Sequence, residues 1–168
     1  MAFEKQVAYM LMDADYHGGG IRGRHSAHDL SRYMIHEHTA ERWLKEINKS
    51  HHIPKDKWQE IGATLTELMI NSRSACCESK ELYIDYQICP GFSGTVIRVE
   101  DDGSGYDYKH EIEKTRAIMH TLDEKAILEH EGSPPGRGGT FCLLNYANRF
   151  AHNEKGNAVA ALFLYSNS

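Results

Sequence analysis

Three polar motifs in the sequence carry residue types that together could hold a nucleotide. ELMIN places Glu67 and Asn71 four residues apart, VEDDGSGYD places Asp101 and two glycines within 99–107, and GRGGT spans 136–140. Carboxylate and amide oxygens suit hydrogen bonding to a base and the binding of Mg²⁺. Backbone N–H groups at a glycine-rich helix start suit phosphate oxygens. The combination predicts an ATP site that holds adenine, Mg²⁺ and a chain of phosphates.

Each motif alone also fits a simpler structure. Glu67 and Asn71 could belong to the solvated polar face that any amphipathic helix has. The glycines around Asp101 could serve a tight turn, and GRGGT could be an ordinary turn into a helix. Spacing within one motif does not decide between these alternatives. The prediction therefore depends on the three motifs occurring together.

The helix that carries the first motif is indicated by its apolar periodicity. Pro54 is expected to open it, since proline is tolerated in a first helical turn, and it should span about 55–78. Glu67 and Asn71 fall nearly opposite its apolar stripe. That stripe consists of Trp58, Ile61, Leu65, Leu68, Met69 and Cys76.

A β-hairpin is expected to carry the second motif. Residues 82–88 alternate in hydrophobicity, Pro90 and Gly91 mark a turn, and residues 95–100 resume with β-branched side chains. The second strand runs directly into Asp101. The carboxylate should therefore stand at a strand end, with flexible backbone beyond it.

The remaining elements follow from shorter signals. We expect a strand at 4–12, a glycine-rich loop at 17–25, helices at 26–33 and 37–49, one or two exposed helices within 108–131, an apolar helix after Thr140, and a closing strand at 158–165. The buried side of the apolar helix should carry Leu143, Tyr146, Ala147 and Phe150.

The composition is that of an ordinary single domain over residues 1–168, with 40% hydrophobic and 26% charged residues. No apolar run approaches the ~20 residues of a membrane span, so no membrane association is expected. The N-terminus lacks the pattern of a cleaved signal, which favours a cytoplasmic protein. A net charge of −5 without a basic cluster argues against nucleic acid as a partner.

Cysteine and histidine patterns raise the alternatives of a disulfide or a metal site. The four cysteines have no metal-ligand spacing, and Cys76 and Cys77 are adjacent, which favours reduced thiols. Five histidines crowd the N-terminal region, where a metal site is an alternative. Because they form no recognised ligand pattern, surface or locally hydrogen-bonded histidines are preferred. These five are His17, His25, His28, His36 and His38.

Taken in order, ELMIN, VEDDGSGYD and GRGGTFCLLNYANRF resemble the motifs of the GHKL ATPase superfamily, whose members share the Bergerat nucleotide-binding fold. The resemblance covers about residues 37–165. As a short domain, the chain is most similar to the anti-sigma-factor serine kinases and related histidine-kinase-like ATPases of bacteria. We therefore expect an α/β two-layer sandwich, in which a mixed, largely antiparallel sheet is covered on one face by helices.

The resemblance also implies a role for each site residue. Asn71 would be the Mg²⁺ ligand, and Glu67 would accept a proton from the attacking hydroxyl or orient it. Asp101 would accept a hydrogen bond from the adenine amino group, where guanine has a carbonyl. Gly103 and Gly105 would let the backbone pass close to the base. Phosphate contacts would come from Gly136, Arg137, Gly138, Gly139 and Thr140.

Two segments lie around this implied site. Residues 107–135 would form a lid over ATP. Residues 1–36 would be an N-terminal extension that completes the sheet or forms a partner surface. Since the sequence contains no phospho-accepting histidine motif and no second domain, a complete sensor histidine kinase is not expected.

The leading functional hypothesis is an ATP- and Mg²⁺-dependent protein serine/threonine kinase. Its partner would be a small regulatory protein such as an anti-sigma antagonist or a sigma factor. The alternative is a non-catalytic switch, in which ATP orders the lid and so controls a protein contact. Phosphotransfer to the histidine of a separately encoded domain is a third class. Glu67 favours a catalyst over a switch, and a homodimer is left open.

Overall fold

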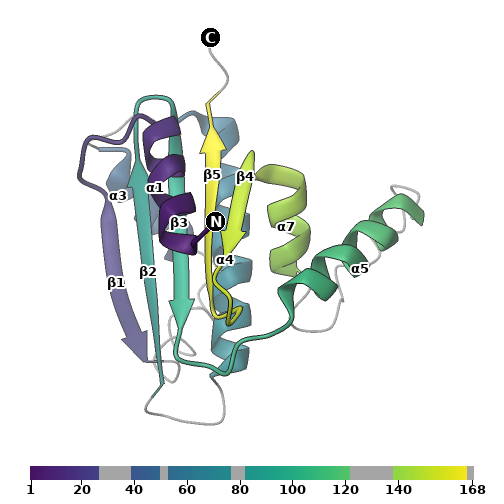
Figure 1. Cartoon of the computed structure of the whole chain (residues 1–168). Coiled ribbons are helices and arrows are strands. Elements are labelled where there is room, and N and C mark those ends of the chain that lie inside the picture. The colour runs from purple at the N-terminus through teal and green to yellow at the C-terminus, as the bar shows by residue number, and fades with distance from the viewer. Residues whose placement is uncertain (27–38, 50–52, 77–81, 122–137, 166–168) are drawn as a thin grey trace.

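The computed structural model describes residues 1–26, 39–49, 53–76, 82–121 and 138–165. Within these ranges five helices and five strands are arranged around one sheet (Figure 1). In chain order they are α1 (Phe3–Asp13), β1 (Ile21–Ser26), α3 (Thr39–Ile47), α4 (Lys55–Ala75), β2 (Tyr83–Pro90), β3 (Gly94–Asp101), α5 (Tyr108–Thr121), α7 (Gly138–Tyr146), β4 (Arg149–His152) and β5 (Ala158–Leu164).

The strands pair antiparallel throughout, in the order β1-β2-β3-β5-β4. The predicted hairpin is confirmed, with Ile88 of β2 opposite Ile97 of β3. The predicted closing strand is also confirmed, and it pairs with β3 so that Glu100 lies opposite Ala158. This order brings the end of β3 beside the turn between β4 and β5. The Asp101 motif and that turn consequently meet at one edge of the sheet.

Helices α3, α4 and α7 form the main core with one face of the sheet. Pro54 caps α4, as expected, and the predicted apolar stripe is confirmed, because Ile61 and Leu65 are fully buried and Trp58 packs against the same core. Every second side chain along the strands points into this core from the sheet, among them Val159, Ala161 and Phe163 of β5. The two-layer α/β fold that the sequence predicted is confirmed.

The opposite face of the sheet is covered by α1, and this corrects the prediction of a strand at 4–12. Val7, Met10 and Ala14 are buried against the sheet, and their spacing follows the helical period rather than strand alternation. Glu4 is held by Arg98 of β3, whose two terminal nitrogens donate to its carboxylate at 3.1 and 2.9 Å. Helices α3, α4 and α7 therefore cover one face, as expected, whereas the cover that α1 adds on the face away from α4 was not predicted.

Two further expectations need correction. The loop expected at 17–25 ends early, since Ile21–Ser26 forms the edge strand β1. The apolar helix after Thr140 ends at Tyr146, which is exposed, and Phe150 belongs to β4 instead. Leu143 and Ala147 do pack against the core, as expected.

Some expected segments lie outside the described residues. The helix expected at 37–49 is present over the described Thr39–Ile47. The helix expected at 26–33 lies outside the described residues, except for Ser26, which belongs to β1. Of the exposed helices expected within 108–131, the described part is α5. No helix among the described residues is long and apolar enough to cross a bilayer.

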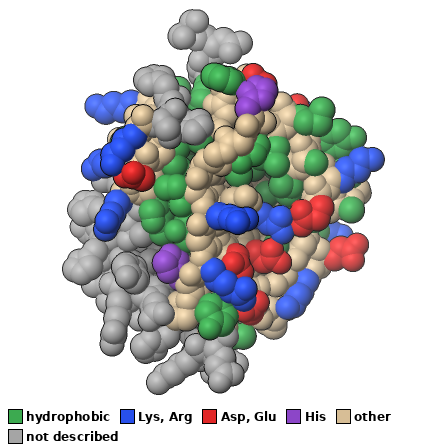
Figure 2. All heavy atoms as spheres, turned by 90° about the vertical axis from the view of Figure 1, so that its left-hand side faces the viewer, with side chains coloured by type: hydrophobic (Ala, Val, Ile, Leu, Met, Phe, Trp, Pro, Cys, Tyr) green, Lys and Arg blue, Asp and Glu red, His purple; other side chains and the backbone are tan. Residues whose placement is uncertain are grey.

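Oppositely charged side chains are interleaved on the β1 side of the molecule, which Figure 2 shows. Arg24 lies 3.8 Å from the Asp85 carboxylate and 3.7 Å from that of Asp102. Arg98 also donates to Glu100, at 2.9 Å. In these pairs, positive and negative groups lie side by side.

Candidate functional site

A cavity of about 410 Å³ lies where α4, the end of β3 and the β4–β5 turn meet. It is lined by Asn71 from the first motif and by Asp101 and Gly105 from the second. Its walls also include apolar side chains, among them Leu68 and Val99. Clefts of this size with a few placed polar groups are typical small-molecule sites. Two of the three predicted motifs thus converge on a single cavity.

Asp101 is a buried carboxylate with a fixed orientation. It is 8% exposed, and its Oδ1 accepts a hydrogen bond of 2.9 Å from the Gly103 N–H. The Ser72 hydroxyl also bonds to it, and burial raises its pKa while these two bonds lower it. Since an ionised carboxylate offers about four lone-pair sites, acceptor capacity is left for a ligand in the cavity.

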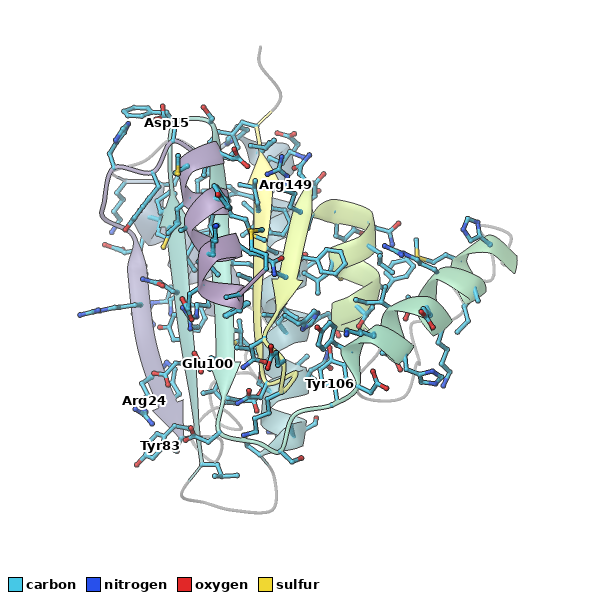
Figure 3. All side chains as sticks on the ribbon, in the orientation of Figure 1. Asp15, Arg24, Tyr83, Glu100, Tyr106 and Arg149 are labelled. Carbon is cyan, nitrogen blue, oxygen red and sulfur yellow. The ribbon has the colours of Figure 1, made fainter. Side chains whose placement is uncertain are left out.

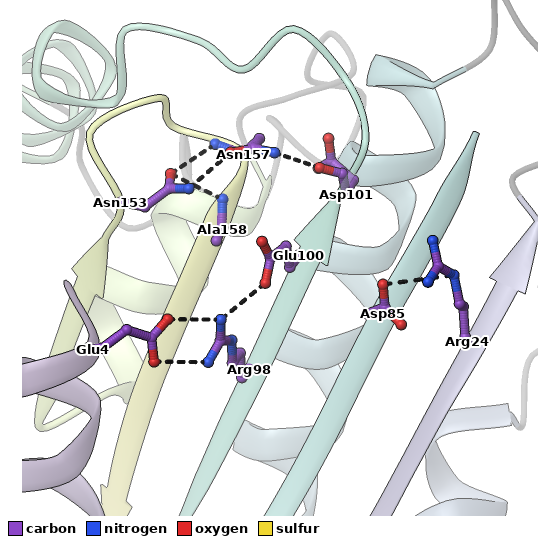
Figure 4. Close-up of polar contacts among 9 residues, drawn as sticks. All are labelled: Glu4, Arg24, Asp85, Arg98, Glu100, Asp101, Asn153, Asn157 and Ala158. Atoms are coloured by element: carbon purple, nitrogen blue, oxygen red, sulfur yellow. Dashed lines mark hydrogen bonds and ion pairs between the residues drawn. The ribbon is translucent and has the colours of Figure 1, made fainter.

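The backbone on either side of Asp101 is tied to the β4–β5 turn (Figure 4). The Asp101 N–H donates to the Asn157 carbonyl at 2.9 Å, and the Asn157 amide donates to the Asp101 carbonyl. The turn itself is organised by Asn153, whose Oδ1 accepts from the N–H groups of Gly156, Asn157 and Ala158. The edge of the cavity is therefore formed by two loops that are joined by hydrogen bonds.

Two glycines interlock these loops. Gly105 has a φ of +78°, and a Cβ there would lie 1.9 Å from the Lys155 carbonyl oxygen. Gly156 has a φ of +76°, and its Cβ would lie 2.1 Å from the Tyr106 carbonyl oxygen. The sequence analysis expected Gly105 to let the backbone pass close to a ligand. The structure shows that glycine is also needed there because the backbone of Lys155 lies so close.

Gly105→Ala is expected to destabilise the protein by about 2–4 kcal/mol, because strain at positive φ and a backbone clash add together. Gly18→Ala is the matched control, since Gly18 has a φ of +105° and a methyl group there would meet nothing within 4 Å. That variant should lose roughly 1–2 kcal/mol from strain alone. Urea unfolding measures both, and equal losses would contradict the interlocking of the two loops.

The first motif faces the start of α7 rather than bulk water. A Cβ at Gly138 would lie 2.0 Å from Glu67 Oε2, and one at Gly139 would lie 2.5 Å from Asn71 Nδ2. The glycines therefore let α7 pack closely on the polar side of α4. These glycines are therefore needed for helix packing whether or not a phosphate binds. Glu67 and Asn71 contact α7, so they do not form the solvated polar face that the sequence left as an alternative.

Of the third motif, the described residues are Gly138, Gly139 and Thr140, which form the first turn of α7. Thr140 is buried, and its side chain hydrogen-bonds to the Tyr106 hydroxyl. Tyr106 lines the cavity and lies between the strand ends and α5 in Figure 3. The α7 start is thereby connected to the cavity wall. Gly136 and Arg137 lie outside the described residues.

Glu67 is half-buried beside this helix start and is not among the residues that line the cavity. Burial raises the pKa of its carboxyl group. Burial, together with the charge of Glu67, raises the pKa of the Cys142 thiol to about 12. Cys142 is therefore a protonated, unreactive thiol at neutral pH.

Several cavity residues were not predicted from the sequence. Ser72, Tyr106, His152 and Asn157 all line it. Tyr106 directly follows the DGSG run and could have been suspected on that ground. His152 was hidden because the four-residue strand β4 follows α7 closely and was interpreted as a continuation of the helix.

His152 is neutral at physiological pH. Burial lowers its pKa to about 4, and its ring stacks on Tyr108 with 4.6 Å between centroids. Because its folded pKa lies below the unfolded value near 6.5, the unfolded state binds more protons between pH 4 and 6.5. Stability contributed by this group is therefore complete above pH 6.5 and is lost as the pH falls through that window.

We expect wild type to lose up to about 3 kcal/mol more stability than His152→Phe between pH 6.5 and 4. Comparing the two proteins removes the contributions of Asp101 and Glu67, whose raised pKa values act in the opposite direction. Denaturant titrations at several pH values measure the difference. Parallel pH profiles would show that His152 takes up its proton equally readily in the folded and unfolded states, which would contradict the lowered pKa.

The described members of the N-terminal histidine group do not converge. His17 lies 3.0 Å from Asp15 in the turn before β1, whereas His25 stacks on Tyr86 within the sheet. His28, His36 and His38 lie outside the described residues. Among the residues that the structure covers, no three His, Cys, Asp or Glu side chains are grouped to hold a metal ion.

Comparison with known proteins finds no related protein. No protein-family model matches the chain, and a search of curated proteins finds no match.

Proposed function

We propose that this chain is an ATP- and Mg²⁺-dependent protein serine/threonine kinase of the GHKL type. The observation that carries the proposal is the cavity in which Asn71, Asp101 and Gly105 meet, with the start of α7 beside it. Residues of two motifs line this cavity, and the described part of the third motif packs against Glu67 and Asn71 of the first. This arrangement supports a shared nucleotide ligand as the proposal.

Asp101 supports adenine as the base. Its carboxylate is buried and fixed by Gly103 and Ser72, and the residue lines the cavity. An exocyclic amino group of adenine can donate to it, whereas guanine presents a carbonyl oxygen that a carboxylate repels. The apolar walls around it suit the faces of a purine ring.

Asn71 fits a role as Mg²⁺ ligand, since its side chain lines the cavity next to the α7 start and carries an amide oxygen. When bound, Mg²⁺ would neutralise charge on the phosphates. The first N–H groups of α7, at Gly138, Gly139 and Thr140, lack intrahelical acceptors and favour an anion at this helix end. Gly136 and Arg137 are proposed to extend the same phosphate contact.

Glu67 is the reason to propose a catalyst rather than a switch. It stands one helical turn from Asn71, and its pKa is raised by burial, which improves a carboxylate as a proton acceptor. In the proposed reaction it accepts the proton of a serine or threonine hydroxyl as the γ-phosphoryl group leaves ADP. The substrate would be a small regulatory protein in the cytoplasm, of the anti-sigma antagonist or sigma-factor type.

The test combines calorimetry with phosphoryl transfer. Wild type should bind ATP in the presence of Mg²⁺ and prefer it to GTP, and it should pass label from γ-labelled ATP to a partner serine or threonine. Absence of nucleotide binding would refute the ATP site. Binding without transfer to any candidate partner, together with nucleotide-dependent protection of 107–135 in hydrogen exchange, would instead identify the switch.

A further inference from the structure

His152 is a buried polar side chain at the cavity that the roles proposed above leave unused. It lies at the end of β4, is 8% exposed, and lines the same cavity as Asp101. Aromatic rings surround it: Tyr108 is stacked on it, and Tyr106 and Phe150 approach edge-on with centroids at 6.0 and 6.1 Å. Packing alone could be achieved by phenylalanine at this position.

The imidazole has hydrogen-bonding capacity that the described part of the chain does not use. Its Nε2 is buried and has no hydrogen-bond partner among the described residues. Leaving such a group unsatisfied in a protein interior is unfavourable by about 1–3 kcal/mol. Rotation about χ2, which has a broad energy profile in histidine, can present a ring nitrogen to the cavity. A ligand there could therefore supply the missing partner.

The sheet register gives the spacing between this imidazole and Asp101. His152 lies opposite Val159 of β5, which lies opposite Val99 of β3, and Asp101 is two residues further along β3. From ordinary strand geometry the Cα atoms of His152 and Asp101 are roughly 12 Å apart. Val99 and Val159 line the cavity between them. Two polar side chains thus border an apolar floor, which suits a planar base with its sugar more than a single ion.

We propose that His152 is a second specificity-determining residue, which hydrogen-bonds the nucleoside part of the bound nucleotide through an imidazole nitrogen. This inference rests on the proposed nucleotide site and adds to it a contact distinct from the carboxylate of Asp101. The imidazole acts as a neutral group, consistent with its lowered pKa. It would discriminate ligands by their base and ribose, and not by their phosphates.

His152→Phe tests this proposal because it keeps a planar ring for stacking and removes both nitrogens. Loss of one neutral hydrogen bond should weaken ATP binding by roughly three- to tenfold. Binding of inorganic triphosphate, which lacks a nucleoside, should be unchanged. At pH 7 the stability of the ligand-free variant should be equal to or above that of wild type, since the unsatisfied nitrogen is gone.

His25→Phe is the matched control, because His25 also stacks on aromatic rings but does not line the cavity. It should leave ATP affinity unaltered. In ¹⁵N-histidine-labelled wild type, ATP should shift the imidazole nitrogen resonances of His152 and leave those of His25 in place.

Equal ATP affinity of wild type and His152→Phe, or equal weakening for ATP and triphosphate, would overturn this inference while leaving the nucleotide site standing. A variant that loses stability and affinity together would show a structural histidine. If wild type does not bind ATP at all, the proposed function fails, and this inference fails with it.

Discussion

Asp101→Asn is expected to weaken ATP binding by tenfold to a hundredfold with little change in fold. An ionised acceptor contributes about 1.5–3 kcal/mol to a hydrogen bond, and an amide at this position can turn its own N–H₂ toward the donor on adenine. The amide oxygen can still accept from the Gly103 N–H, so the loop following β3 keeps its anchor. Preference for ATP over GTP should fall in parallel.

Asp102→Asn provides the control for this prediction. Asp102 is adjacent but exposed, and its Oδ2 accepts from the Tyr83 N–H at 3.0 Å at the start of β2. That variant perturbs the same strand end without touching the cavity. Calorimetric titration of both variants with ATP and GTP is the measurement. Equal affinities of wild type and Asp101→Asn would remove Asp101 from base recognition.

The sequence predicted best those elements whose periodicity is long and unbroken. Helix α4 has an apolar stripe that runs from Trp58 to Met69 and continues to Cys76 at its C-cap, and the β2–β3 hairpin alternates over enough residues to fix both its type and its faces. Asp101 could be placed at a strand end because the turn residues after it follow at once. These signals are local, so no tertiary information was needed to interpret them.

Short or ambiguous segments were predicted less well. Residues 4–12 contain enough apolar side chains for either type of element, and the deciding feature is the packing of Val7, Met10 and Ala14 on a sheet assembled from distant strands. The strand β4 has four residues, too few for periodicity to distinguish it from the end of α7. Position in the tertiary structure, rather than propensity, decided both cases.

The same distinction applies to the candidate site. Glu67, Asn71 and Asp101 were recognisable from residue type and spacing, whereas His152 and Asn157 reach the cavity because β4 and β5 follow β3 in space. The role of Gly138 and Gly139 was also seen incompletely. Their contact with Glu67 and Asn71 depends on how closely two helices pack, which one sequence does not reveal.

Glu67→Gln is expected to lower phosphoryl transfer by about a hundredfold to ten-thousandfold while leaving ATP affinity nearly unchanged. A positioned general base contributes rate enhancement of this order, and glutamine keeps the size and polarity of the side chain beside Gly138 but cannot accept the proton. Single-turnover transfer from γ-labelled ATP measures the rate of phosphoryl transfer, and a separate titration measures ATP affinity. Together they show whether only the rate has fallen. Glu60→Gln is the control, because Glu60 lies on the same helix, bonds Lys57 at 2.7 Å, and has no proposed role in transfer.

Substitution of Asn71, in contrast to that of Glu67, should affect ATP binding itself. Asn71→Ala removes the proposed metal ligand and should reduce Mg²⁺-dependent ATP binding, whereas Asn71→Asp keeps a hard oxygen donor and should retain it. The alanine variant also removes the amide packed against Gly139, so its unfolding must be compared with that of the aspartate variant. If Glu67→Gln and Asn71→Ala lose binding equally, Glu67 is a structural residue of the α4–α7 contact. If Glu67→Gln transfers phosphate at the wild-type rate, Glu67 is not the base, and ATP at this site would act through conformation alone.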